Sequence, residues 1–220
     1  MDIALIRARL RSVMQQDIHQ QGDAYLIRSL YFDDFDDNCL DENEAGVDLR
    51  HKYRIRLYDP AAQDMRLEIK SKVSGLTHKT SSRITRQECA QMMQGRAPAA
   101  FDSRKALSDM RVQMLTRLMR PRAIIEYERC AFVYPAGNVR ITFDRNITAS
   151  RACGDFLKDT VSCRMPLLPQ GMHVLEVKYD ELLPDYIAQL LEIRKLQQSA
   201  FSKYYLGRLA ICGEFAASVL

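Results

Sequence analysis

The chain has 220 residues, of which 47% are hydrophobic and 27% charged, a composition typical of a soluble globular protein with a single domain over residues 1–220. Its net charge of +4 is too small an excess to predict nucleic-acid binding, and no segment approaches the roughly 20 consecutive apolar residues of a membrane-spanning helix. The six cysteines show no C-x-x-C or zinc spacing and the N-terminus lacks the apolar centre of a signal peptide, so the sequence predicts a cytoplasmic protein with free thiols.

The first half of the chain is predicted to form a helix and then a series of strands. Apolar residues near helical spacing predict an amphipathic helix over 3–15, and β-forming residues predict a strand over 24–33. The acidic run 33–44 is predicted as a loop or a short helix. Turn signals at Asp59-Pro60 and Ser74-Gly75 separate three further strands, which are predicted over 49–58, 65–73 and 77–85.

The second half is predicted to add helices, two hairpin strands and one more strand. A helix over 103–119 would begin at a cap formed by Asp102 or Ser103 and end at Pro121. The other elements expected here are a helix over 86–94, strands over 122–134, 138–144 and 172–179, mostly irregular structure over 145–171, and helices over 184–191 and 201–215. Consecutive hairpins imply antiparallel pairing, so the predicted fold class is α+β.

Charged and apolar side chains alternate along the strand predicted over 49–58. Successive side chains of a strand point to opposite faces, so Tyr53, Ile55 and Leu57 share one face. The other face carries only basic residues, which are Arg50, Lys52, Arg54 and Arg56. Any antiparallel sheet with one solvent-exposed face shows such alternation, so one strand alone does not indicate a function.

The same alternation recurs on other predicted strands. Exposed faces normally mix charges of both signs across neighbouring strands, whereas these rows are mostly cationic and rich in Arg, which binds phosphate through paired hydrogen bonds. Like charges that converge need an anion to offset their repulsion. The side chains that share the polar face are Arg66, Glu68, Lys70 and Lys72; Lys79, Ser81 and Arg83; Arg140, Thr142 and Asp144; and Glu176 and Lys178.

A closed antiparallel barrel would bring these basic residues together, because the strands of a small barrel alternate between inside and outside. The sequence therefore predicts an antiparallel β-barrel or tunnel with helices over its apolar outer face and a basic lining that binds a phosphate-rich anion. Glu68, Glu176 and one of Glu126 or Glu128 would supply oxygen ligands for a divalent metal.

The strand predicted over 122–134 does not follow the pattern, because both of its faces carry charge. Glu126 and Glu128 would share one face, and Tyr127 and Arg129 the other. A β-bulge is one way to reconcile the two faces with a basic lining.

The acidic run is predicted to be a solvated loop, because its spacing is not that of a calcium-binding loop. Its acidic residues include Asp33, Asp34, Asp36, Asp37 and Asp41. Among nearby and C-terminal aromatic residues, Tyr31, Phe32 and Phe201 are predicted to belong to the core rather than to a ligand site.

Seven motifs occur in an order that resembles one known family. They are IRSLYFDD, GVDLRHKYRIRLY, LEIKSK, IIEYERCAF, VRITFD, VLEVKY and FSKYYLGR. In this order they resemble the VTC domain, the polyphosphate polymerase domain of vacuolar transporter chaperone proteins and their bacterial relatives. That domain is similar to CYTH phosphatases and RNA triphosphatases, and all of them are triphosphate tunnel metalloenzymes.

The resemblance implies an eight-stranded tunnel, Mn²⁺ or Mg²⁺ as cofactor, and transfer of the terminal phosphate of ATP onto a polyphosphate chain. It implies that the transferred group is bound by Arg54, Arg56, Lys70 and Lys203, and that Glu176 binds the metal. The alternation of faces makes Glu68 and Glu128 further candidates for metal binding. Together, the resemblance and the alternation predict a set of phosphate-binding residues. They are Arg50, Lys52, Lys72, Lys79, Arg83, Arg129, Arg140 and Lys178.

The family's first strand, with an R-x-E-x-K-type motif, has no counterpart because the chain begins at Met1. A misassigned start, a truncated chain and a degenerate member are all consistent with this. The missing strand favours a module that only binds polyphosphate as the alternative to a polymerase. A triphosphatase is a further alternative, because the sequence separates it poorly from a polymerase. A nucleic-acid binder is the weakest alternative, since no stacking aromatic groups accompany the basic residues. The oligomeric state stays open, as does a membrane-protein partner.

Overall fold

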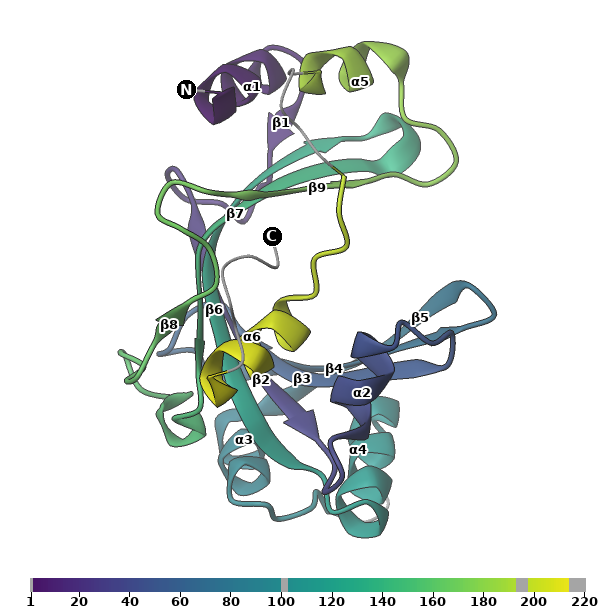
Figure 1. Cartoon of the computed structure of the whole chain (residues 1–220), viewed down its shortest axis with the longest axis vertical. Helices are drawn as coiled ribbons and strands as arrows, with labels where there is room; N and C mark the ends of the chain where they lie inside the picture. Colours follow the sequence, from purple (N-terminus) through teal and green to yellow (C-terminus); the bar gives the residue numbers. More distant parts are fainter. Residues whose placement is uncertain (1, 100–102, 193–197, 214–220) are drawn as a thin grey trace. The chain divides into compact units, whose positions relative to one another are not determined.

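The computed structural model describes residues 2–99, 103–192 and 198–213 and shows an α+β fold (Figure 1). The strands are β1 (Gln15–Gln16), β2 (Tyr25–Asp33), β3 (Arg50–Leu57), β4 (Asp64–Val73), β5 (Leu76–Thr85), β6 (Arg120–Tyr134), β7 (Val139–Ser150), β8 (Met165–Pro166) and β9 (Val174–Lys178). The helices are α1 (Asp2–Arg11), α2 (Asn38–Glu44), α3 (Arg86–Met93), α4 (Lys105–Thr116), α5 (Asp185–Leu191) and α6 (Lys203–Cys212), with short 3-10 turns η1 (Ala136–Asn138) and η2 (Cys153–Asp155).

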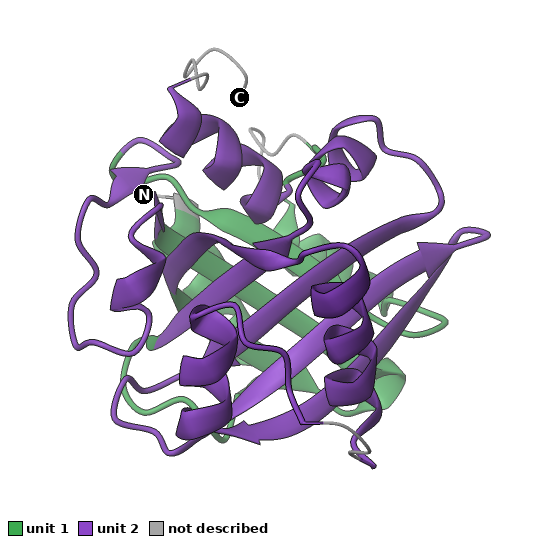
Figure 2. Ribbon diagram, turned by 90° about the horizontal axis from the view of Figure 1, so that it is seen from below, with its two compact units in different colours: residues 1–25, 128–146, 170–201 green, residues 26–127, 147–169, 202–220 purple. Residues whose placement is uncertain are grey.

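The chain divides into two compact units, shown in green and purple in Figure 2. Unit 1 comprises residues 1–25, 128–146 and 170–201. Unit 2 comprises residues 26–127, 147–169 and 202–220. The long strands β6 and β7 contribute residues to both units.

Unit 2 is built on an antiparallel sheet whose apolar face is covered by helices. The strands follow the order β5-β4-β3-β2-β6-β7-β8. The helices α3 and α4 pack on β4 and β5, where Leu67 and Ile84 are fully buried. A capping box formed by Thr85 and Glu88 starts α3 directly after β5.

Unit 1 has its own hydrophobic core. Its part of β6 pairs with β1, and its part of β7 pairs with β9. Side chains of α1, β6, β7 and α5 form the core, and Leu10, Phe132, Phe143 and Ile187 are among them. The rings of Phe132 and Phe143 meet edge to face with their centroids 6.2 Å apart, an arrangement that aromatic pairs favour.

The predicted elements agree with the structure in type, and several boundaries are corrected. Strand β7 continues to Ser150, through part of the segment that was predicted to be irregular. The N-cap of helix α4 is Arg104, which makes no side-chain cap bond, and not the predicted Ser103. The helix ends at Thr116, while Pro121 lies inside β6. Asp102, the other cap candidate, lies outside the described residues. The short strands β1 and β8 were not predicted.

The sheet has nine strands, and among the described residues no pairing closes it into a barrel. The structure therefore shows the α+β class, antiparallel strands and six helices in the described part of the chain. All six cysteines are free thiols, as predicted. None of the helices in the described residues has the length and apolar character that crossing a membrane requires.

Candidate phosphate-binding site

Cross-strand register aligns the basic residues of β3, β4 and β5 in unit 2. Tyr53, Ile55 and Leu57 are buried, so the predicted alternation of faces along β3 is confirmed. Residues that lie directly opposite share a face of the sheet. The resulting basic rows are Arg50–Lys72, Lys52–Lys70–Lys79, Arg54–Glu68–Ser81 and Arg56–Arg66–Arg83.

Glu68 is the one carboxylate within the basic rows, and it is 2% exposed. Its Oε2 accepts a hydrogen bond from Arg54 Nε at 2.8 Å and lies 3.8 Å from Arg56 Nη1. Its Oε1 pairs with Lys79. Burial raises the pKa of this carboxyl, but the charges of Arg54 and Arg56 outweigh burial and lower the pKa to about 2. Glu68, predicted as a metal ligand, is thus the internal counter-ion of the basic rows.

The pKa of Tyr31 indicates a positive potential on the same face of the sheet. Tyr31 lies opposite Arg54 on the neighbouring strand β2, and its hydroxyl accepts a hydrogen bond from Arg54 Nη1 at 3.1 Å. Burial raises the pKa of this phenol, yet the charges of Arg54 and Arg56 lower it to about 8. Burial lowers the pKa of Lys52, and the charges of Arg50 and Arg54 act in the same direction. One carboxylate therefore does not neutralise the basic rows.

Helix α6 carries Lys203 and packs closely on β6 in unit 2. A Cβ atom on Gly207 would meet the end of the Ile125 side chain and lie 3.3 Å from Ala149 Cβ, so the helix approaches β6 and β7 closely here. Ser202 caps the helix by accepting a hydrogen bond from Tyr205 N. Lys52 Nζ donates to Ser202 Oγ at 3.1 Å, and Lys203 Nζ lies 5.1 Å from the centre of the Tyr127 ring. Lys203 is therefore held near the basic rows from a distant part of the sequence.

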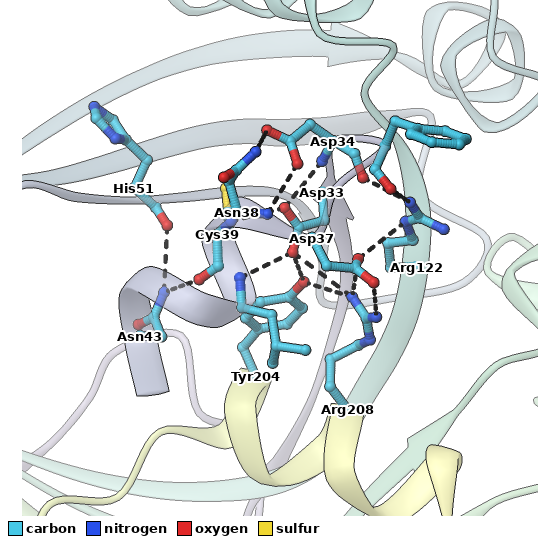
Figure 3. Close-up of polar contacts among 12 residues, drawn as sticks. Asp33, Asp34, Asp37, Asn38, Cys39, Asn43, His51, Arg122, Tyr204 and Arg208 are labelled. Atoms are coloured by element: carbon cyan, nitrogen blue, oxygen red, sulfur yellow. Dashed lines mark hydrogen bonds and ion pairs between the residues drawn. The ribbon is translucent and has the colours of Figure 1, made fainter. Parts of the chain in front are cut away.

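A polar network joins α6 to the loop that follows β2, and Figure 3 shows its residues. Asp33 is fully buried and accepts hydrogen bonds from the backbone N–H groups of Cys39 and Leu40, at 2.9 and 3.0 Å. The Tyr204 hydroxyl donates to Asp33 Oδ2 at 2.5 Å. The Tyr204 ring also stacks on Tyr31, with 4.9 Å between centroids. The network thus fixes α6 beside the Tyr31–Arg54 contact.

The prediction of a solvated acidic loop is wrong for part of the run. Asp34 is 2% exposed and accepts from the backbone and side chain of Asn38. Asp37 accepts two hydrogen bonds from Arg208, at 2.9 and 2.8 Å. These carboxylates hold the start of α2 and the middle of α6. Tyr204 and Arg208 belong to the motif FSKYYLGR, but the sequence assigned them no partners, because Asp33 and Asp37 lie far away in the chain.

A second group of predicted residues lies on one face of unit 1. Arg129 makes two hydrogen bonds to Asp144, at 2.6 and 2.8 Å, and its Nη2 lies 3.6 Å from Glu176 Oε2. Lys178 Nζ lies 3.0 Å from Glu176 Oε1. Arg140 pairs with Asp17 at 2.7 Å and also donates to Tyr25. These basic residues therefore already have carboxylate partners.

The glutamates predicted on one face of β6 have basic or polar partners in the structure. In unit 2, Arg28 Nε donates to Glu126 Oε2 at 2.5 Å, and its other nitrogens donate to backbone carbonyls of the segment 156–159. In unit 1, Glu128 accepts from Arg145 and Asn146, each at 2.9 Å. Glu128, predicted as a metal ligand, therefore has partners of its own.

Arg50 and Arg83 lie in the outer rows of the basic set. Arg50 donates to the carbonyl groups of Gly46 and Val47. Arg83 is largely exposed, and its Nη1 lies 3.7 Å from Asp64 Oδ2. Phe201 is half-buried, while Phe32 is in the core as predicted.

The predicted metal ligands are distributed over both units, with Glu68 in unit 2 and Glu128 and Glu176 in unit 1. Within the described residues, no group of three or more His, Cys, Asp or Glu side chains gathers to hold a metal. Glu176 lies across from Thr142, next to the Arg129–Asp144 pair. Mg²⁺ typically takes one or two carboxylates and completes its shell with phosphate and water. The oxygen donors around Glu176 fit that chemistry.

Comparisons with known proteins show the family of the chain and a similar fold. A family model described as the VTC domain matches residues 1–211. A search of curated proteins gives no match. The structure is similar to the crystal structure of a Bacillus halodurans protein provisionally assigned as an adenylate cyclase, with a TM-score of 0.51 and 12% identity over 91% of this chain and 90% of that chain. This likeness shows the fold alone, whereas the family match covers nearly the whole sequence, and the chain belongs to the VTC domain family.

Proposed function

We propose that the chain binds ATP and polyphosphate through its basic rows and transfers phosphoryl groups from ATP to make polyphosphate. The observation that carries this proposal is the uneven charge of the polar face of β3, β4 and β5. The rows hold many cations and the single carboxylate Glu68. The pKa of Tyr31, lowered to about 8, is the expected effect of an uncompensated positive potential. A chain of phosphates would supply the missing negative charge.

Phosphoryl transfer needs positioning and charge neutralisation more than covalent help from the protein. An oxygen of the terminal phosphate of the chain would attack the γ-phosphorus of ATP, the bond from that phosphorus to the bridging oxygen would break, and ADP would leave. Arg54 and Arg56 would hold oxygens of the transferred group, and Lys70 and Lys203 would neutralise charge beside it. Guanidinium groups suit this role because they bind two phosphate oxygens at once.

A transferase explains the acidic residues better than a hydrolase does. A triphosphatase needs a base or a positioning group for water. The pKa of Glu68 is lowered to about 2 by Arg54 and Arg56 against the effect of burial, so its carboxylate is a poor proton acceptor. A phosphate chain is already ionised and needs no such base. The same residues would also suffice for a module that binds polyphosphate without reaction.

Mn²⁺ or Mg²⁺ would be held by Glu176, with Asp144 beside it. When bound, a divalent cation would supply positive charge that offsets the negative charge of phosphate oxygens. Arg129 and Lys178, which pair with Glu176 in the free protein, would then be available to phosphate.

The test is to incubate purified protein with ATP and Mn²⁺ and to look for polyphosphate on a gel and for free phosphate in solution. The variant Arg54→Ala/Arg56→Ala should make no polymer. The variant Arg11→Ala/Arg117→Ala is the matched control, because it removes the same charge from exposed positions outside the basic rows, and it should behave like the natural sequence. Tight polyphosphate binding without polymer would indicate a binding module, and release of phosphate alone would indicate a triphosphatase.

A further inference from the structure

Thr142 has a buried hydroxyl group without a hydrogen-bond partner. The residue lies on β7 in unit 1 and is 3% exposed. Its Oγ1 is among the few buried side-chain atoms of the described residues for which the structure shows no partner. Nearly all buried polar groups in proteins are hydrogen-bonded, and an unmade bond costs stability. An orphan hydroxyl in a well-packed strand therefore calls for an explanation.

Thr142 has charged residues around it on β7 and β9. Register places it directly across from Glu176, between the pairs Arg140–Lys178 and Asp144–Val174. The side chains of directly opposed residues share a face, with their Cβ atoms about 5 Å apart. The Thr142 hydroxyl thus lies on the face that carries the Arg129–Asp144 and Lys178–Glu176 contacts.

We propose that Thr142 is a phosphate-binding residue whose hydroxyl donates a hydrogen bond to an oxygen of the bound phosphate chain. This inference rests on the proposed function, since a phosphate chain is the substrate proposed there. In the free protein, Arg129 and Lys178 are drawn to Glu176. When a phosphate group enters, these cations turn to its oxygens, and the side chain of Glu176, which is 38% exposed, moves toward solvent or toward a cation. The hydroxyl of Thr142 is then uncovered and meets an anionic acceptor.

The chemistry of threonine fits this position. Arg and Lys neutralise any anion, whereas a fixed hydroxyl requires an oxygen acceptor at a defined place. The β-branched side chain has few rotamers in a strand, so the hydroxyl is already oriented before the ligand arrives. Thr142 would therefore contribute to the position of the phosphate chain as well as to affinity.

The experiment compares Thr142→Val with Thr142→Ser, using tripolyphosphate as the probe. Binding is measured by calorimetry with EDTA and again with Mn²⁺, and the melting temperature is measured without ligand. Valine keeps the branched shape and removes the hydroxyl, and serine keeps the hydroxyl. Thr148→Val is the matched control, because Thr148 lies on the same strand and its hydroxyl already donates to the carbonyl of Glu126.

Thr142→Val should bind tripolyphosphate about tenfold more weakly, the usual effect of losing one hydrogen bond to a charged group, with EDTA and with Mn²⁺ alike. Thr142→Ser should stay within about twofold of the natural sequence, and Thr148→Val should bind normally. Without ligand, Thr142→Val should melt no lower than the natural sequence, because an unpaired buried hydroxyl stabilises nothing.

Three results would overturn the inference and leave the proposed function standing, as long as the natural sequence binds tripolyphosphate. The first is unchanged binding of tripolyphosphate by Thr142→Val. The second is a loss of affinity seen only with Mn²⁺, which would place the hydroxyl on the metal. The third is a clear fall in the ligand-free melting temperature, which would show that the hydroxyl has a partner in the free protein. Failure of the natural sequence itself to bind tripolyphosphate would overturn both.

Discussion

Arg54 and Glu68 lie directly opposite each other on β3 and β4, and two guanidinium nitrogens of Arg54 contact the same carboxylate oxygen at 2.8 and 2.7 Å. Glu68 also pairs with Lys79 and lies near Arg56. One buried carboxylate thus holds several cations together in the free protein. Burying an ion pair stabilises little by itself, but removing one member leaves the other charges uncompensated.

Glu68→Gln should lower the free energy of unfolding at pH 7 by about 3 kcal/mol, because it leaves Arg54, Arg56 and Lys79 without their carboxylate. The pKa of Glu68 is lowered to about 2 in the folded chain, against about 4.3 when unfolded. The stability that Glu68 contributes is therefore present above pH 4.3 and is lost as the pH falls through about 2. Urea unfolding over this pH range measures the effect.

Asp64→Asn is the control for Glu68→Gln, because Asp64 is on the same strand but exposed, with Arg83 at 3.7 Å. Surface ion pairs contribute little to stability, so Asp64→Asn should change the free energy of unfolding by less than about 0.5 kcal/mol. Tripolyphosphate should restore stability to Glu68→Gln, since phosphate replaces the lost negative charge. A variant as stable as the natural sequence without ligand would contradict the role given to Glu68.

Tyr31 should ionise near pH 8, because Arg54 and Arg56 lower the pKa of its phenol against the effect of burial. Near-ultraviolet difference titration should show one early transition among the ten tyrosines, and Tyr31→Phe should remove it. Saturating tripolyphosphate should move the transition to higher pH, because bound anions offset the positive potential. A transition near the ordinary tyrosine pKa of about 10 would contradict the positive potential inferred for the basic rows.

Tyr204→Phe should lower the free energy of unfolding by about 2 kcal/mol, because the fully buried Asp33 loses the hydroxyl that donates to it at 2.5 Å. Chemical denaturation gives the value. Tyr205→Phe is the neighbouring control: its hydroxyl meets Glu44 at an exposed position, and its loss should cost less than about 0.5 kcal/mol. Equal effects of the two substitutions would show that the network around Asp33 does not fix α6.

The sequence was sufficient to predict which basic side chains of β3 and β4 share the polar face, because strict alternation leaves each side chain only one of two faces. The partners across the sheet could not be predicted in the same way. Arg28 and Glu126 meet from strands that are distant in the sequence, and this pairing compensates the charge of Glu126 on β6.

Other features depend on local conformations that alternation does not reveal. Asn146 lies within β7 and adopts a left-handed backbone conformation. The alternation of faces breaks there, but the strand continues to Ser150. The buried Asp33 looks like any other residue of an acidic run until Tyr204 and the start of α2 are placed beside it. Thr142 is an ordinary residue in sequence, and only the structure shows that its hydroxyl is buried without a partner.

The most direct test of the central claim is the affinity for tripolyphosphate, measured by calorimetry without metal, for the natural sequence, Arg54→Ala/Arg56→Ala and Arg11→Ala/Arg117→Ala. If the basic rows bind phosphate, the first variant should bind at least about a hundredfold more weakly, since each lost ionic hydrogen bond is worth roughly tenfold. The second should bind as the natural sequence does. Equal losses in the two variants would show that binding follows net charge alone and would contradict a site on β3, β4 and β5.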